Sequence, residues 1–277
     1  MKRVLAVRPD PALLQALDST TAPADREIEV CEGNVDALRR LRERAIDVVL
    51  TDPATAFNED LAFAVELRTI RPGVKVIVLA PHASREELVE AMRRHVFACF
   101  TLPFDFAAIA DMVRTALATE TWRDGIEVAS GSPEWLTLRV SCHLVTADRL
   151  VRFMAEYQPS MPSVERDRLM TAFREMLLNA MEHGAGFDPE KAIEVTAART
   201  ARAIVYHFRD PGCGFCRADL AHAAASNLPE HVVTSALERS ALGMRPGGFG
   251  MLIARQIVDE VIYNERGNEV LLIKHLS

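Results

Sequence analysis

Three polar side chains recur at every fourth position in an otherwise apolar stretch of the second half of the chain. Glu175, Asn179 and His183 all lie in "FREMLLNAMEH", residues 173–183. At roughly 100° per residue they would share one edge of a helix. A carboxylate there can order or deprotonate a nucleophile, and a carboxamide oxygen is a suitable ligand for Mg²⁺. The opposite side of this helix should pack into a core through its apolar residues: Leu169, Phe173, Met176, Leu177 and Ala180.

Two later segments also carry residue types suited to a nucleotide. Asp210 opens "DPGCGF" directly after a strand pattern, where its carboxylate can accept a hydrogen bond from an exocyclic amine such as that of adenine. Gly247, Gly248 and Gly250 run straight into a helix pattern. Glycines allow close backbone approach, and a helix N-terminus offers unpaired N–H groups and a positive dipole end that suit phosphate.

Each of these segments taken alone has an ordinary structural interpretation. A polar stripe on a helix is usually its solvent face, Asp-Pro-Gly after a strand is a common turn, and glycine-rich approaches to helices also serve plain connections. Taken together and in this order, the three segments favour a nucleotide pocket. In that pocket the polar helix edge forms one wall, and Asn179 with phosphate oxygens would hold Mg²⁺.

The first 120 residues have a regular alternation of elements. Short β-rich runs occur at 3–7, 27–31, 47–51, 74–80 and 97–102, and amphipathic stretches at 10–17, 34–44, 59–70, 84–95 and 105–119. Five strand–helix repeats predict an α/β domain with a doubly wound, parallel, five-stranded sheet. Asn34 and Ser84 are expected helix N-caps, and Glu87 completes a capping box with Ser84.

The alternation breaks at 121–134, where Gly125, Gly131 and Pro133 predict a linker or the rim of a new domain. Residues 135–277 then form a second domain. Strands are expected at 135–142, 192–200, 203–210 and 269–276, helices at 146–157, 163–184 and 249–261, and a loop-rich stretch at 211–247. This order predicts an α+β sandwich, with a mixed sheet and helices on one face.

The three segments of the second domain resemble the N, G1 and G2 boxes of the GHKL (Bergerat-fold) ATP-binding family, which includes gyrase, heat-shock chaperones and histidine kinases. The resemblance covers about 126–277, and it is strongest to the anti-sigma-factor serine kinases, which share the pattern "E…NA..HG". It implies that Glu175 is the general base and Asn179 the Mg²⁺ ligand, and that Asp210 reads adenine. The implied ATP-binding set is Asn179, His183, Asp210, Gly212, Gly214, Gly247, Gly248 and Gly250.

Two departures from that family bear on turnover. Pro246 stands where the histidine-kinase G2 pattern has its first glycine, and the 216–245 segment is longer than the lid of a minimal anti-sigma kinase. Cys213 and Cys216 have the spacing of a redox or zinc pair. There is no second pair to complete a zinc site, so the spacing is interpreted as incidental.

The first domain resembles a response-regulator receiver over about residues 2–118. Asp52 lies at the end of the third strand pattern, where that family has its phosphoacceptor. The rest of the family's site is altered. Arg8-Pro9 replaces an acidic pair, Ala80 replaces a Ser or Thr, and Leu102 replaces a Lys. We therefore expect a degenerate receiver that is not phosphorylated, used for docking or dimerisation. An unrelated flavodoxin-like domain is the alternative.

Composition narrows the class of protein. The chain has 277 residues, 49% of them hydrophobic and 26% charged, with a net charge of −7. This suits two folded domains and gives no basic footprint for nucleic acid. Five scattered cysteines and the lack of a long apolar run predict a soluble, cytoplasmic protein without direct nucleic-acid or membrane contact.

The function expected from these observations is cytoplasmic signalling that depends on ATP and Mg²⁺. The favoured activity is phosphorylation of a serine on an anti-sigma-factor antagonist, with or without sequestration of a sigma factor, in a chain that is free to form a homodimer. One alternative is a non-catalytic switch that binds ATP or only docks a partner in a two-component pathway. Another is a rearranged histidine kinase that acts on a separate phosphotransfer protein.

Overall fold

The computed structural model describes residues 1–20, 26–120, 123–158, 161–214 and 250–276. The chain divides into two compact units. The N-terminal unit comprises 1–124 together with 152–157, and the C-terminal unit comprises 125–151 together with 158–277. Within the described ranges, none of the helices combines the length and the apolar character that a membrane crossing requires.

The N-terminal unit is built on a five-stranded parallel sheet with the order β2-β1-β3-β4-β5. Its strands are β1 (Lys2–Val7), β2 (Arg26–Cys31), β3 (Val48–Leu50), β4 (Lys75–Ala80) and β5 (Ala98–Thr101). This is the doubly wound order of flavodoxin-like folds, and it confirms the predicted fold class. The chain changes direction at β1, which pairs with β2 on one side and β3 on the other, so a crevice is expected at the carboxyl ends of these strands.

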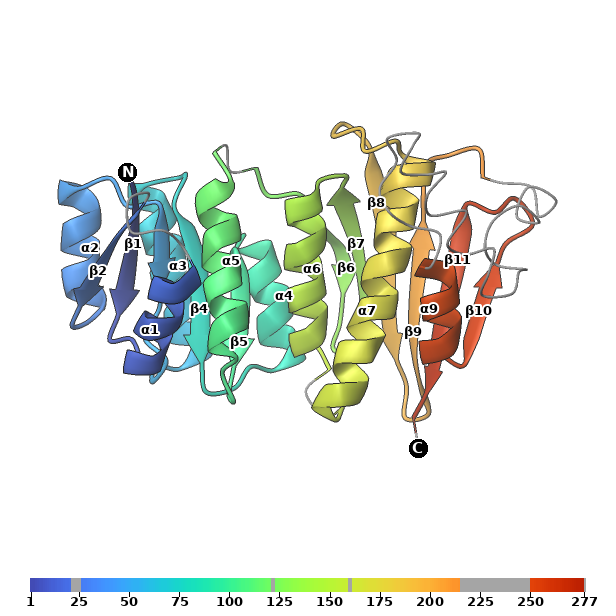
Figure 1. Ribbon diagram of the computed structural model, residues 1–277, viewed down its shortest axis with the longest axis horizontal. Coiled ribbons are helices and arrows are strands. Elements are labelled where there is room, and N and C mark those ends of the chain that lie inside the picture. The colour runs from blue at the N-terminus through green and yellow to red at the C-terminus, as the bar shows by residue number, and fades with distance from the viewer. Residues whose placement is uncertain (21–25, 121–122, 159–160, 215–249, 277) are drawn as a thin grey trace. The chain divides into compact units, whose positions relative to one another are not determined.

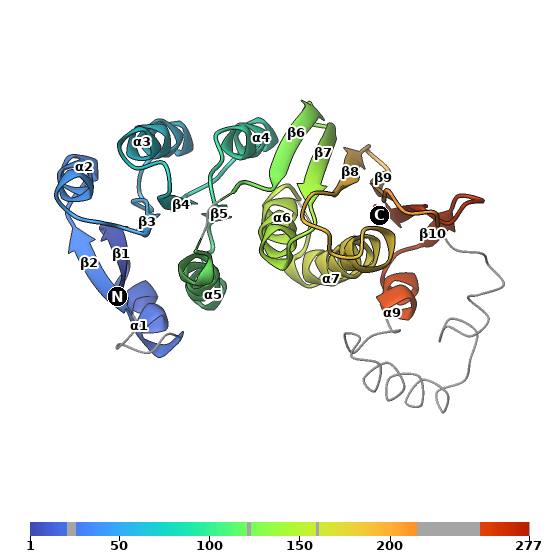
Figure 2. The same cartoon turned by 90° about the horizontal axis from the view of Figure 1, so that it is seen from above.

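Five helices cover the two faces of this sheet: α1 (Pro11–Thr20), α2 (Asn34–Glu43), α3 (Phe57–Ile70), α4 (Arg85–Arg93) and α5 (Phe106–Ala118). α1 and α5 pack together on one face, whereas α2, α3 and α4 follow one another on the other (Figures 1 and 2). The central strands β3 and β4 are buried along their whole length, as expected of strands covered on both faces. Helix α4 begins with the predicted Ser84–Glu87 capping box.

The C-terminal unit contains a six-stranded sheet with the order β10-β11-β9-β8-β7-β6. Its strands are β6 (Ile126–Gly131), β7 (Trp135–Ser141), β8 (Ala192–Arg199), β9 (Ala203–Arg209), β10 (Glu260–Tyr263) and β11 (Glu269–His275). Every pairing in this sheet is antiparallel, which corrects the expected mixed sheet. Two helices join β7 to β8, and an even number of helices lets the chain re-enter the sheet in the opposite direction.

Helices α7 (Ser163–Asn179) and α9 (Gly250–Ile257) lie on one face of this sheet, together with the part of α6 (Leu144–Glu156) up to residue 151, which belongs to this unit (Figure 2). The apolar side of α7 is buried as predicted. Phe173 anchors it, because its ring lies 4.8 Å from the ring of Tyr206 and 5.0 Å from that of Phe208, measured between centroids. Aromatic contacts of this kind fix the rotation of α7 about its axis, and therefore fix which side chains face away from the sheet.

Three local features differ from the sequence prediction. Strand β6 lies within 121–134, which was predicted as a linker or the rim of a new domain and not as a strand, and β10 replaces the end of the helix expected over 249–261. The helix expected over 163–184 ends at Asn179, and a π-helical turn follows at Ala180–Gly184. The last of these changes bears directly on the polar edge of α7.

Candidate functional site

The carboxylate of Glu175 lies against the beginning of helix α9. A Cβ atom added at Gly250 would be 2.6 Å from Glu175 Oε2 and 3.2 Å from Glu175 Cβ, so a side chain at this position would displace the carboxylate. Helices α7 and α9 pack along each other. The N-terminus of a helix carries partial positive charge, which favours a carboxylate or a phosphate at this point. The fold therefore brings the polar edge of α7, at Glu175, into contact with the end of the glycine-rich segment, at Gly250.

Asn179 ends helix α7 one turn after Glu175, and both side chains are half-buried. The Asn179 side chain makes no capping hydrogen bond to the π-helical turn that follows. His183 lies within that turn and is exposed. The α-helix that carries Glu175 and Asn179 ends at Asn179, and His183 lies in a turn of different hydrogen-bond pattern. The single regular helix expected from sequence therefore ends before His183.

Asp210 follows directly after strand β9 and lies against the end of the π-helical turn. A Cβ atom at Gly184 would be only 2.1 Å from Asp210 Cγ, so this close approach requires glycine. The backbone N–H of Gly212 donates to Asp210 Oδ1 at 2.8 Å. Burial raises the pKa of Asp210, while this hydrogen bond and the charge of Arg266 act in the opposite direction. The result is a partly desolvated acceptor, held in place by its own turn.

The turn between β10 and β11 supports Asp210 from the other side. Asp210 N donates to Asn268 O at 3.0 Å, and Asn268 Nδ2 donates back to Asp210 O at 3.3 Å. Asn268 is itself held by Asn264, whose Nδ2 donates to Asn268 Oδ1 at 2.9 Å. Gly214 has a φ of +80°, and a Cβ there would be 1.9 Å from Arg266 O. This tight packing explains the need for a glycine at position 214.

The structure thus places the predicted residues in two clusters. In one cluster Glu175 contacts Gly250, and in the other Asp210 contacts Gly212. Sequence reasoning missed the supporting residues Gly184, Asn264 and Asn268. The "HG" step after the helix and the Asn-rich turn "NERGN" were the available signals.

Several predicted features lie outside the described residues: Gly247, Gly248, Cys216 and the long 216–245 segment. Cys213 is described, and it is an exposed free thiol. In the part of the chain that the structure describes, no group of three or more His, Cys, Asp or Glu side chains could hold a metal.

In the N-terminal unit, Asp52 lies just after β3 and is 2% exposed. Its carboxylate forms an ion pair with Arg8, which follows β1, and its Oδ1 accepts from the backbone N–H of Ala54 at 2.9 Å. A guanidinium therefore contacts the carboxylate at the side where the receiver family has an acidic pair. Ala80 is buried, and Leu102 is exposed.

A second carboxyl group, Asp60, lies fully buried in the first turn of α3. Its Oδ1 is 2.6 Å from Thr55 Oγ1, which is also 2.8 Å from the backbone oxygen of Asp52. A threonine hydroxyl has one proton to donate, so both contacts are hydrogen bonds only when Asp60 carries a proton. Burial raises the pKa of Asp60 to about 7, and the negative charges of Asp52 and Glu59 act in the same direction.

Because Asp60 is buried, we expect the free energy of unfolding to depend on pH. Because the pKa of Asp60 is higher in the folded than in the unfolded chain, its contribution to the free energy of unfolding is most favourable below pH 4. That contribution should fall as the pH rises from about 4 to about 7. Asp60→Asn should be more stable than wild type at pH 8, by on the order of 2 kcal/mol, with little difference at pH 4. Denaturant unfolding at the two pH values tests this, with the exposed-site variant Asp111→Asn as control. An equal difference at both pH values would contradict it.

Comparison with known proteins gives a separate result for each half of the chain. Residues 140–274 match the family model of the histidine kinase-like ATPase domain. The transcriptional regulatory protein GlrR of Escherichia coli K12 is 28% identical over 148 residues, which are 51% of this chain and 33% of that protein. ZraR of Salmonella typhimurium, also a transcriptional regulatory protein, is 30% identical over 97 residues, 35% of this chain and 22% of that protein.

The chain therefore spans about a third or less of the length of the curated relatives it matches. Among solved structures, a response regulator from Thermotoga maritima aligns over 43% of this chain and 99% of its own length. Its sequence identity is 18% and the TM-score is 0.38.

Proposed function

We propose that this chain, which joins a receiver domain to a histidine kinase-like ATPase domain, is a signalling regulator that uses Mg-ATP to phosphorylate a serine on a protein partner. The matched domain type implies ATP binding. The observation that carries the proposal is the approach of Gly250 to Glu175, one helical turn from Asn179. This arrangement supports the proposal, because a carboxylate beside a helix N-terminus could accept a proton next to a bound phosphate.

Both clusters support this proposal. The backbone at Gly184, Gly212 and Gly250 approaches the two carboxylates closely, and ATP would extend from Asp210 at one end to the α9 terminus at the other. Asp210 would accept a hydrogen bond from the adenine amine. Asn179 would hold Mg²⁺ together with phosphate oxygens, and the metal would offset negative charge on the phosphates.

In the proposed reaction, Glu175 accepts the proton of a serine hydroxyl while the serine oxygen bonds to the γ-phosphorus. The bond from the γ-phosphorus to the β–γ bridging oxygen breaks, and that oxygen leaves as part of ADP. The proposed partner is an anti-sigma-factor antagonist, with sequestration of a sigma factor as the accompanying binding function. It rests on the "E…NA..HG" pattern of the helix.

Removal of the Asn179 carboxamide should abolish Mg²⁺-dependent nucleotide binding. In calorimetric titrations of the full chain with ATP, wild type should bind more tightly with Mg²⁺ than without it, and Asn179→Ala should lose that difference. Thr171→Ala, at an exposed position on the same helix, is the control and should bind as wild type does. No binding by wild type at millimolar ATP would refute the nucleotide site. Binding without any phosphoserine on partner proteins would instead indicate a non-catalytic switch.

A further inference from the structure

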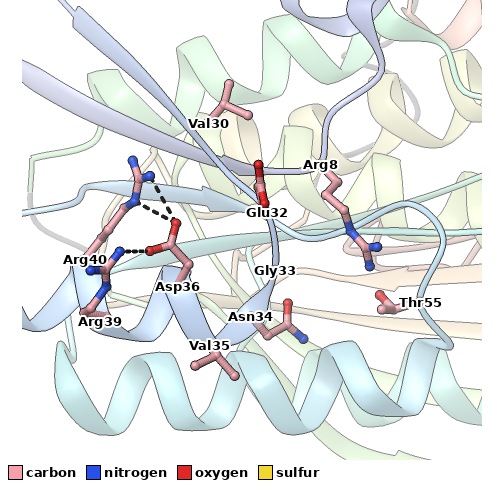
Figure 3. A pocket seen from close by; sticks show the side chains of 10 residues that line it. All are labelled: Arg8, Val30, Glu32, Gly33, Asn34, Val35, Asp36, Arg39, Arg40 and Thr55. Carbon is pink, nitrogen blue, oxygen red and sulfur yellow. Dashed lines mark hydrogen bonds and ion pairs between the residues drawn. The ribbon is translucent and has the colours of Figure 1, made fainter.

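A cavity of about 890 Å³ opens in the N-terminal unit, and Figure 3 shows the residues around it. They come from the end of β2, the segments after β1 and β2, the first turns of α2, and the loop after β3. This is the point where the strand order changes direction, which is where open α/β sheets bind ligands. The volume is in the range of sites for small molecules. Both its place and its size therefore indicate a small-molecule site.

Arg8 supplies the main charged group at one end of this cavity. Its φ of 41° is in the left-handed region, an uncommon and strained conformation for a non-glycine residue. The side chain extends toward Thr55 and Asn34 (Figure 3) and is 57% exposed although it pairs with Asp52. A guanidinium has five N–H donors, and Nη2 makes the ion pair with Asp52.

The first turn of α2 adds further polar groups to the same end of the cavity. Asn34, expected as the N-cap, is instead the first residue of α2, and Gly33 takes the cap position without any side-chain hydrogen bond. Within the described part of the chain, the buried Oδ1 of Asn34 has no hydrogen-bond partner. A buried oxygen of this kind costs free energy when no donor reaches it, and this cost falls on the first residue of α2, at the edge of the cavity.

The remaining walls define the class of ligand. Three arginines and two carboxylates line the cavity, and the carboxylate of Asp52 pairs with Arg8 from outside this lining. Asp36 accepts from Arg39 and, at 3.1 Å, from Arg40 Nε, so these groups largely satisfy one another. Val30 and Val35 expose apolar surface beside them. An organic molecule with one anionic group would match both the charge at Arg8 and the apolar surface.

We propose that the N-terminal unit binds a small organic anion non-covalently in this cavity, with the guanidinium of Arg8 holding the anionic group. The shared chemistry is an oxyanion, either a phosphate ester or a carboxylate, because the planar guanidinium binds both in the same fork geometry. Asp52 competes with the ligand for Arg8. The position that accepts a phosphoryl group in receivers would then tune ligand affinity in this chain.

The test uses three probes with the full chain: phenyl phosphate, benzoate and inorganic phosphate. Amide NMR shifts of Gly33, Asn34 and Thr55 locate binding in this cavity rather than in the ATP domain. Phenyl phosphate or benzoate should shift these amides saturably, and whichever binds more tightly assigns the anion as phosphate ester or carboxylate. Inorganic phosphate should bind at least fivefold more weakly than phenyl phosphate. Equal affinity would overturn the organic part of the proposal.

Three variants test the role of Arg8. Arg8→Lys keeps the charge beside buried Asp52 and removes the fork, so affinity should fall at least fivefold. Arg114→Lys is the matched control, because Arg114 is also 57% exposed and paired with an aspartate, and it should bind as wild type does. Asp52→Asn removes the competitor and should raise affinity several-fold. The absence of saturable shifts in wild type, equal effects of the two lysine variants, or unchanged affinity in Asp52→Asn would each overturn the assignment to Arg8.

Discussion

Replacement of Glu175 by glutamine should reduce phosphotransfer at least about a hundredfold, the usual scale for loss of a general base, while ATP affinity stays within about twofold of wild type. Glutamine keeps the shape and volume of the side chain, so its packing against Gly250 at the start of α9 should persist. What the variant loses is the ability to take the proton of the attacking hydroxyl. Binding and chemistry should therefore separate in this variant.

The measurement pairs two assays on the same preparations. Calorimetry gives the dissociation constant for Mg-ATP, and radiolabelled γ-phosphate reports phosphoserine on partner proteins. Glu165→Gln, at an exposed position in the first turn of α7, is the matched control and should transfer phosphate at the wild-type rate. Equal transfer by Glu175→Gln and wild type would remove Glu175 from the mechanism. It would leave the ATP site itself intact, since Asn179→Ala tests that separately.

The N-terminal fold was predictable because its sequence pattern and its tertiary structure agree. Apolar runs such as 74–80 become strands buried on both faces, and the amphipathic stretches between them become the covering helices. The capping box at Ser84 and Glu87 was also predictable, since both of its hydrogen bonds form within one helical turn. The local residue pattern predicts an element correctly where it favours the same structure as the tertiary contacts do.

The strands at the two edges of the second sheet were missed for a common reason. β6 carries Gly131 and is followed by Pro133, so its sequence resembles a turn, although it pairs with β7. β10 continues the apolar pattern of helix α9. That helix ends at Ile257, and the next segment joins β11 instead: Asp259 N donates to Ile273 O at 2.9 Å, and His275 N donates to Asp259 Oδ2 at 2.6 Å. Both elements were decided by pairing with the next strand of the chain, and the residue pattern of each segment alone does not show that pairing.

The candidate ATP site was predictable in its residue types but not in its geometry. Periodicity placed Glu175 and Asn179 on one helix edge, and the structure confirms this. It could not foresee the π-helical turn that ends the pattern before His183. The role of Gly184 was also hidden, because it depends on contact with Asp210 from another element. Contacts between two residues that are far apart in the sequence leave no periodic pattern in it.

The N-terminal unit should not be switched by aspartyl phosphate. The Asp52 carboxylate is buried and paired with Arg8, so a guanidinium takes the place where carboxylates of a receiver would hold Mg²⁺. Arginine offsets the charge of Asp52 but has no open coordination position to accept a phosphoryl oxygen. The receiver family's lysine and hydroxyl positions are Leu102 and Ala80, which donate no side-chain hydrogen bond. With neither metal nor donors, the carboxylate is a poor nucleophile toward an anionic phosphodonor.

The decisive measurement is the intact mass of the full chain after incubation with Mg²⁺ and acetyl phosphate, with Asp52→Asn treated in parallel. We expect no added phosphoryl mass in either protein. Amide shifts near Arg8 without a change in mass would be consistent with this expectation, because they report non-covalent binding of the same anion. Stoichiometric addition to wild type that disappears in Asp52→Asn would show a working phosphoacceptor. In that case the Arg8–Asp52 pair must open in solution and admit Mg²⁺, and the cavity beside it would serve the phosphodonor rather than a separate ligand.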